Sequence, residues 1–149
     1  MEDRNASGHN PGVKIPSLLV LFTCVVAACS SPTPDHPPLK ELQRTTAGDL
    51  EVVLLATNDA LSLGKSQSTI EFQRRSDHQL VDVGAVKATA TMPMEGTSPM
   101  QGSVFVNRTE TPGRYMLDAD LGMNGTWHLT VSWDGPAGQG AAAFPGTVR

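Results

Sequence analysis

The feature that most constrains the fold of this 149-residue chain is a period of two in its apolar residues from Gly48 onward. Successive side chains of a β-strand point to opposite faces, so this alternation predicts strands that are buried on one side. It appears in residues 50–56, 69–74, 85–92, 103–107, 114–121, 126–134 and 140–148, with turn-forming Gly, Pro, Asn and Asp residues between them. About seven short strands in roughly 100 residues predict an all-β sandwich with one core.

The strands predicted at 114–121 and 126–134 lead to the most detailed structural expectation. Each has one apolar face, formed by Tyr115, Leu117, Ala119 and Leu121 in the first strand and by Trp127, Leu129, Val131 and Trp133 in the second. We expect a hairpin, because only residues 122–125 separate the two strands. If both apolar faces enter the same core, Leu121 pairs with Trp127, and Asp120 lies opposite His128 on the outer face. That register requires an odd-length loop or a bulge.

The N-terminal part of the chain contains fourteen apolar or small residues, 15–28, followed by Cys29 and Ser30. A membrane-spanning helix needs about 20 apolar residues, so this run is too short to remain as an ordinary span. It resembles a bacterial lipoprotein export signal. We therefore predict that residues 1–28 are a signal peptide cleaved before Cys29, and that Cys29 carries the lipid. A buried core helix would leave the Ala-Ala-Cys-Ser junction unexplained.

Processing before Cys29 determines the expected organisation of the remaining chain. Cys24 leaves with the signal peptide and Cys29 is lipidated, so the mature chain forms no internal disulfide. Residues 29–47 begin with a Pro-rich segment, and we predict a tether with one helical turn near 39–47. The β-sandwich domain is predicted at 48–149. We expect the protein in the cell envelope, anchored to a membrane through Cys29, and Ser30 favours the outer membrane facing the periplasm in a Gram-negative cell.

Three segments of the predicted domain resemble a known family. They are Val86-Lys87-Ala88 through Thr91-Met92-Pro93-Met94, then Pro112-Gly113-Arg114-Tyr115, and then Gly125-Thr126-Trp127-His128-Leu129-Thr130-Val131. This pattern is similar to the YtkA-like domain, a relative of FixH, and the resemblance covers nearly all of residues 48–148. It implies an immunoglobulin-like β-sandwich that is exported or membrane-tethered and is associated with copper handling or heavy-metal efflux.

Methionines supply the candidate binding chemistry. Within 32 residues the chain carries Met92, Met94, Met100, Met116 and Met123, and a loop bracketed by Pro93 and Pro99 gathers the first three. Thioether sulfur is a soft ligand that prefers Cu(I), and a neutral imidazole also binds metals. The candidate copper ligands are therefore Met92, Met94, Met100, Met123 and His128.

Each candidate ligand also has a structural interpretation. Met92 continues the inward alternation of its strand, and methionine is an adaptable core residue. His128 also fits a solvated residue paired with Asp120, and Met116 is predicted on the outer face. The sequence therefore leaves two functions open. One is an envelope copper-handling module that supports metal efflux or oxidase assembly, and the other is a non-metal protein-interaction module for an envelope partner.

Other functional classes lack their usual sequence features. The net charge is −4 and no basic stripe is present, so we expect no nucleic-acid partner. The sequence contains no Gly-x-Ser-x-Gly elbow and no mature cysteine nucleophile. We therefore expect neither an enzyme nor an organic cofactor.

Overall fold

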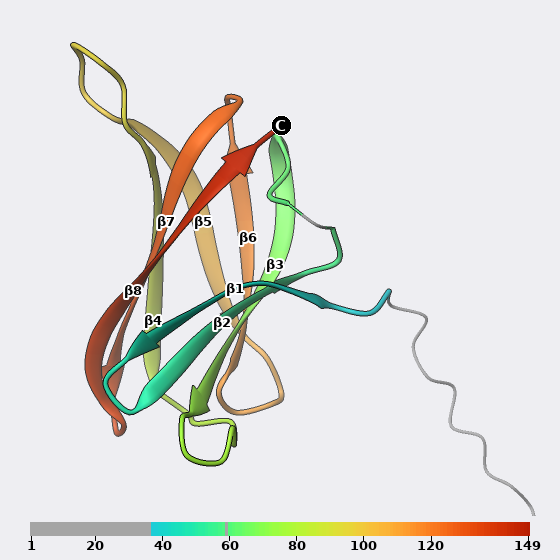
Figure 1. The fold of residues 1–149 in the computed structure, drawn as a ribbon, viewed down its shortest axis with the longest axis vertical. Helices are drawn as coiled ribbons and strands as arrows, with labels where there is room; N and C mark the ends of the chain where they lie inside the picture. The colour runs from blue at the N-terminus through green and yellow to red at the C-terminus, as the bar shows by residue number, and fades with distance from the viewer. Residues whose placement is uncertain (1–36, 59) are drawn as a thin grey trace, which may run out of the picture. The chain divides into compact units, whose positions relative to one another are not determined.

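The computed structural model describes residues 37–58 and 60–149, which form an all-β, immunoglobulin-like sandwich (Figure 1). The strands are β1 (Lys40–Ala47), β2 (Leu50–Ala56), β3 (Gly64–Arg74), β4 (Ala85–Met92), β5 (Met100–Arg108), β6 (Arg114–Leu121), β7 (Gly125–Gly135) and β8 (Gly138–Val148). The predicted fold class is confirmed, and all seven predicted strands are present. The predicted signal peptide and Cys29 lie outside the described residues. Within those residues, no helix has the length and apolarity needed to cross a membrane.

The strands follow the antiparallel order β1-β2-β3-β6-β5-β4-β7-β8, and β5 belongs to both layers of the sandwich. Its residues 103–108 pair with β6, whereas residues 100–102 pair with β4. The chain passes between the layers at Gly102, where an added Cβ would lie 2.8 Å from Leu121 Cδ2 and 3.1 Å from a ring carbon of Trp127. Glycine therefore allows β5 to pack closely over the core at this corner. Strands β1 and β8 stand at the two ends of this strand order, and they contact each other.

Strand β1 corrects the prediction of a helical turn near 39–47. It pairs antiparallel with β2 from Lys40 opposite Ala56 to Ala47 opposite Leu50. Leu42 and Ala47 pack against the core, so long-range pairing and burial determine the conformation of a segment whose local pattern is weak. The sheet therefore begins at Lys40 rather than near Gly48, and the predicted tether loses its last eight residues to the domain.

The predicted hairpin between 114–121 and 126–134 is wrong, although the inward faces of both strands are right. Strand β6 pairs with β3 and β5, whereas β7 pairs with β4 and β8. Leu121 and Trp127 meet inside the core from opposite layers and are not neighbours in one sheet. Two strands that face a common core from opposite layers show the same alternation as two adjacent strands, so the pattern cannot distinguish them.

Asp120 and His128 consequently do not lie opposite each other, so the predicted pairing of these two residues is also wrong. Asp120 lies opposite Lys65 of β3 and Ser103 of β5. His128 lies opposite Thr91 of β4 and Pro145 of β8, in the other layer.

The interior of the sandwich contains two apolar clusters. The larger is built around Phe72, whose ring stands edge-on to Tyr115 and Trp133 at centroid distances of 5.6 and 5.1 Å. The smaller consists of Ala90, Met92, Leu121, Trp127 and Val148, with Met100 packed against it. The smaller cluster lies beneath the methionine-bearing loop.

Candidate functional site

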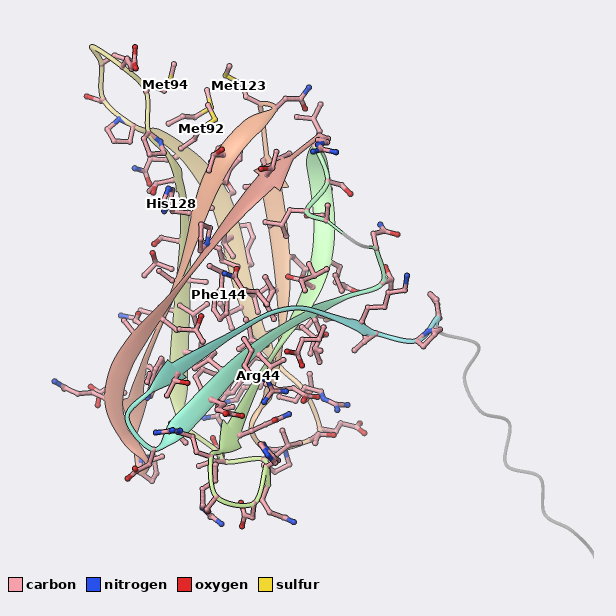
Figure 2. All side chains as sticks on the ribbon, in the orientation of Figure 1. Arg44, Met92, Met94, Met123, His128 and Phe144 are labelled. Atoms are coloured by element: carbon pink, nitrogen blue, oxygen red, sulfur yellow. The ribbon has the colours of Figure 1, made fainter. Side chains whose placement is uncertain are left out.

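Four of the five predicted ligands lie at one end of the sandwich, here called the methionine end. This end consists of the β4–β5 loop (93–99), the β6–β7 turn (122–124) and the strand ends beside them. Figure 2 shows Met92, Met94 and Met123 at this end, with sulfur atoms in yellow. The polypeptide brings residues of the Pro93–Pro99 loop together with a turn that lies more than 20 residues later in the sequence.

Met92 and Met100 are directly opposite each other in the β4–β5 ladder. Side chains at opposed positions share a face, with Cβ atoms about 4.5–5.5 Å apart. Met92 is 7% exposed and belongs to the smaller core cluster, and Met100 is half-buried against it. The structural interpretation of Met92 as a core residue is therefore correct.

The sulfur of Met92 also lies against the backbone of the neighbouring β6–β7 connection. A Cβ added to Gly125 would be 2.7 Å from Met92 Sδ. Gly125 has φ of +147°, which side-chain-bearing residues rarely adopt. Glycine at this position thus lets a strand that begins two residues after Met123 approach a buried thioether.

Met94 and Met123 present their thioethers to solvent, with exposed fractions of 38% and 41%. Met94 lies in the β4–β5 loop and Met123 in the β6–β7 turn. The backbone carbonyl of Met123 accepts a hydrogen bond of 2.9 Å from Nε1–H of the fully buried Trp127. The methionine end therefore combines an inner pair of sulfurs with two accessible ones.

His128 and Met116 lie away from this group. His128 points outward from β7, opposite Thr91, whereas Met92 follows Thr91 and points inward. Met92 and His128 consequently occupy opposite faces of one layer. Met116 is half-buried on β6, opposite Thr69 and Asn107, in the other layer. The structure thus places four methionines, Met92, Met94, Met100 and Met123, at one end, and it places His128 on the face opposite to Met92.

The donor atoms at the methionine end are thioether sulfurs, which are soft ligands. Within residues 37–58 and 60–149, no three His, Cys, Asp or Glu side chains gather in an arrangement suited to a metal. Hard cations such as Ca²⁺ or Mg²⁺ require oxygen ligands, and zinc prefers thiolate, imidazole and carboxylate. Thioether sulfur selects Cu(I). The chemistry of the residues present therefore fits copper better than these other ions.

Sequence reasoning missed Gly125 and the backbone-directed role of Trp127. Trp127 was expected only as a core residue, and Gly125 only as part of a turn. The available signal was the presence of Gly125 and Trp127 within four residues after Met123. This sequence feature indicates a role at the site only once the fold has placed the Met92 sulfur against Gly125.

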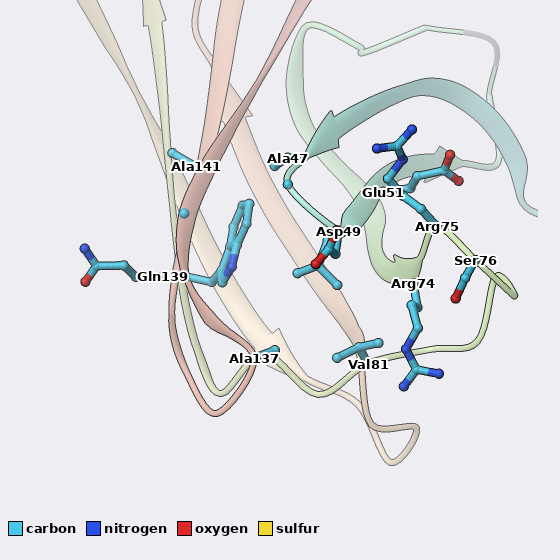
Figure 3. Close-up of a pocket in the computed structure, with 14 residues that line it drawn as sticks. Ala47, Asp49, Glu51, Arg74, Arg75, Ser76, Val81, Ala137, Gln139 and Ala141 are labelled. Carbon is cyan, nitrogen blue, oxygen red and sulfur yellow. The ribbon is translucent and has the colours of Figure 1, made fainter.

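The opposite end of the sandwich contains a hollow (Figure 3). The β1–β2 turn, the β3–β4 loop and the β7–β8 turn surround it, and Trp133 contributes to its lining. Gly140 packs on the Trp133 indole, where an added Cβ would lie 2.5 Å from a ring carbon. No candidate metal ligand from the sequence lies there.

A polar network covers the outer face of the strands near this hollow. Arg44 Nη1 donates to Glu51 Oε2 at 2.5 Å and to Gln73 Oε1 at 3.2 Å. Two further hydrogen bonds from Arg44, to Glu41 at 3.1 and 2.8 Å, hold the pKa of Glu41 below its ordinary value. Gln73 in turn donates to Glu71. These bonds link β1, β2 and β3, so the network stabilises the sheet and leaves the arginine paired.

A second polar group joins the β3–β4 loop to β6. The hydroxyl of Tyr115 donates to Asp82 Oδ1 at 3.1 Å and to the Gly84 carbonyl at 3.0 Å. The Gly84 N–H, followed by the Tyr115 hydroxyl, lowers the pKa of Asp82. Burial, followed by the Asp82 carboxylate, raises the pKa of Tyr115. Tyr115 is therefore a neutral donor that fastens the loop.

Comparisons with solved structures give only distant likenesses. The chain is similar to PcoC, a methionine rich copper resistance protein from Escherichia coli, at 17% identity over 60% of this chain and 89% of that chain, with a TM-score of 0.44. The selenomethionine form of PcoC gives 18% identity over 60% and 91% of the two chains, with a TM-score of 0.45. The ZirS C-terminal domain gives 14% identity over 99% and 88%, also with a TM-score of 0.45.

These structural likenesses are too distant to carry a function, because one fold hosts many unrelated activities. Among curated proteins, no sequence relative matches the chain. A family model, YtkA-like, matches residues 44–132, which is more than half of the chain. The match spans β4, β6 and most of β7, the strands on which the resemblance was identified. The chain belongs to the YtkA-like family.

Proposed function

We propose that this protein is an envelope copper-binding module that holds Cu(I) through methionine thioethers at the methionine end. The observation that carries the proposal is the placement of Met92. It lies opposite Met100 in the β-ladder, and its sulfur is seated on Gly125, next to the turn that bears Met123. Membership of the YtkA-like family supports the same assignment through the association of that family with copper handling. The role is in binding rather than catalysis.

The burial of the sulfurs suggests a division of roles. Met94 and Met123 are accessible, so they would meet an incoming ion first and release it to a partner. Met92 and Met100 are held by the core and the ladder, so they would complete the ligand set from within. Copper bound at a rim would be exchanged readily with a metal efflux component or an oxidase assembly factor, which are the proposed partners.

A site formed by thioether sulfurs alone should bind Cu(I) with an affinity that does not depend on pH. Thioethers carry no ionisable proton, whereas an imidazole ligand must be deprotonated to bind a metal. Binding through the methionines alone should be constant between about pH 5 and pH 8, a range in which histidine changes its charge. Participation of His128 would weaken binding toward the acid side. Its position on the opposite face from Met92 favours the first result.

Anaerobic titration of the purified chain with Cu(I), in competition with a chelator of micromolar affinity, tests the proposal. Wild type should retain one Cu(I), and Met94→Leu combined with Met123→Leu should lower the affinity at least about tenfold, since ligand softness determines the preference. Met116→Leu is the matched control and should bind as wild type. Failure of wild type to retain Cu(I), or equal binding by the double variant, would overturn the assignment.

We also propose that the chain is lipid-anchored at Cys29, on the outer membrane facing the periplasm in a Gram-negative cell. Several acyl chains hold a protein firmly to a bilayer, whereas one holds it only marginally. Labelled palmitate should therefore enter the wild-type protein, and Cys29→Ser should abolish incorporation and release the protein from the membrane fraction. Label that persists in the variant would refute the anchor.

The exposed apolar side chains support a second candidate, an interaction module without metal. Phe105 on the outer face of β5 is 69% exposed, and Leu63 and Met123 are exposed near the methionine end. Crosslinking to an envelope partner distinguishes the two functions. Capture that persists after copper chelation and in the Met94→Leu, Met123→Leu variant, yet is lost in Phe105→Ala, would favour the interaction module.

A further inference from the structure

The β6–β7 turn that carries Met123 is tied to the core by one side chain. Trp127 is fully buried, and its Nε1–H donates to the Met123 carbonyl at 2.9 Å. Among the side-chain hydrogen bonds of the described residues, this one alone reaches residues 92–100 or 121–125. The indole therefore determines where the backbone of Met123 stands above the small core cluster.

A second contact fixes the other side of the same turn. Met92 Sδ lies where a Gly125 side chain would begin, at 2.7 Å from the ideal Cβ position. Met92, Leu121 and Trp127 belong to one buried cluster, so this contact is continuous with the packing around the indole. The Met123 backbone is thus set by Trp127 on one side and by the Met92–Gly125 approach on the other.

We infer that Trp127 and Gly125 are positioning residues for the copper site, an inference that rests on the proposed function. They would hold Met123 at a fixed distance from Met92 before the ion arrives. Ordering a mobile turn costs conformational entropy at the moment of binding, and a turn ordered in advance avoids that cost. Sites held by packed residues and hydrogen bonds behind the ligands keep their geometry better than sites on free loops.

The hydrogen bond also makes Trp127 a reporter of the site. Coordination by the Met123 sulfur would disturb the carbonyl of the same residue, and the indole N–H bonded to that carbonyl would sense the change. Trp133 provides an internal reference, because it lies near the other end of β7 and packs on Phe72. Cu(I) should therefore move the indole N–H resonance of Trp127 and leave that of Trp133 in place.

The test uses Trp127→Phe and the matched control Trp133→Phe, each titrated with Cu(I) alone as the probe. Both variants lose similar aromatic volume from buried sites of the same strand, so their melting temperatures should fall comparably. Trp127→Phe should weaken Cu(I) binding about tenfold, the effect of one net hydrogen bond, whereas Trp133→Phe should bind as wild type. Gly125→Ala should also weaken binding. Gly138→Ala is the control, because Gly138 lies at the opposite end of the sandwich, has a φ of +94° and leaves an added Cβ with nothing within 4 Å, so this variant should bind as wild type.

The outcomes separate this inference from the proposed function. A wild-type protein that retains no Cu(I) would overturn both. If wild type binds and Trp127→Phe binds equally well, the positioning role is wrong and the sulfur site stands. If Trp127→Phe fails to fold, the indole resonances of wild type decide. A Cu(I)-induced shift at Trp127 that exceeds the shift at Trp133 supports the inference, and equal or absent shifts contradict it.

Discussion

The two ends of the sandwich are built from different chemistry. At the end bearing the large hollow, Phe72, Tyr115 and Trp133 pack ring against ring, and ion pairs and hydrogen bonds connect the strands around them. At the methionine end, the core is a smaller cluster around Trp127. Among the side-chain hydrogen bonds of the described residues, one reaches the β6–β7 turn and none reaches the β4–β5 loop. Directional bonds are thus concentrated at one end and adaptable thioethers at the other.

The difference between the two ends fits a stable domain that carries the proposed copper site at its more adaptable end. Rings, ion pairs and hydrogen bonds have specific geometries, so they fix the end at which they gather. Thioether side chains are unbranched and flexible, so they fill gaps and adapt to an ion or to a partner. The stability of a domain is unevenly distributed, and regions that bind ligands belong to its less stable parts.

Removal of either tryptophan should give the largest loss of stability. It also tests most directly whether the two ends of the sandwich are independent. Trp127→Ala and Trp133→Ala should each lower the free energy of unfolding by about 3 to 5 kcal/mol, because both side chains are buried. Urea unfolding measures this loss. Only Trp127→Ala should also abolish Cu(I) retention. Equal loss of copper in both variants would show that the two ends are coupled, and an unchanged midpoint for Trp127→Ala would contradict its burial.

A larger residue at Gly102, where β5 passes from one layer to the other, should give the next largest loss of stability. An added methyl at Gly102 would press on Leu121 and Trp127, so Gly102→Ala should cost about 1 to 3 kcal/mol of stability. Gly122→Ala is the control at the same end and should stay within about 0.5 kcal/mol of wild type. Thermal unfolding distinguishes them. Equal midpoints would mean that β5 does not pass over the core as closely as the structure places it.

Breaking an ion pair at the opposite end should have a moderate effect on stability and none on copper. Glu71 has a side chain only 9% exposed, and it accepts hydrogen bonds from Arg114 Nε at 2.8 Å and Gln73 at 2.9 Å. Glu71→Ala should cost about 1 to 2 kcal/mol, since Arg114 is 40% exposed and regains water. Glu71→Gln should cost less. A change in Cu(I) affinity in either variant would contradict the separation of the two ends.

The smallest expected effect concerns pH. The pKa of Asp82 is lowered in the folded protein, so its contribution to stability is present above the unfolded pKa and is lost as the pH falls through the lowered value. Asp82→Asn should therefore lower the melting temperature slightly at neutral pH. The difference from wild type should vanish in acid, below the lowered pKa. A difference that stays constant with pH would mean that the carboxylate charge is not the cause.

The sequence predicted most of the elements but not their arrangement. Residues 50–56, 85–92 and 114–121 were placed as strands with the bounds that the structure has, because alternation is a local property. Strand β1 was missed, since its pattern is weak and its partner β2 decides its conformation. The inward faces of β6 and β7 were right, whereas their pairing was wrong.

The same distinction applies to the candidate site: its residue types could be predicted from the sequence, but their arrangement could not. The amino-acid sequence alone shows that thioether side chains are abundant between Met92 and Met123, and its alternation predicts Trp127 as a core residue. The pairing of distant strands places Met92 opposite Met100, brings its sulfur against Gly125 and turns His128 to the other face. The type of residue determines which metal ion is preferred, because chemical softness is a property of the ligand atom itself. Which atoms meet depends on strand pairing between distant segments, and alternation along one strand does not specify its neighbour.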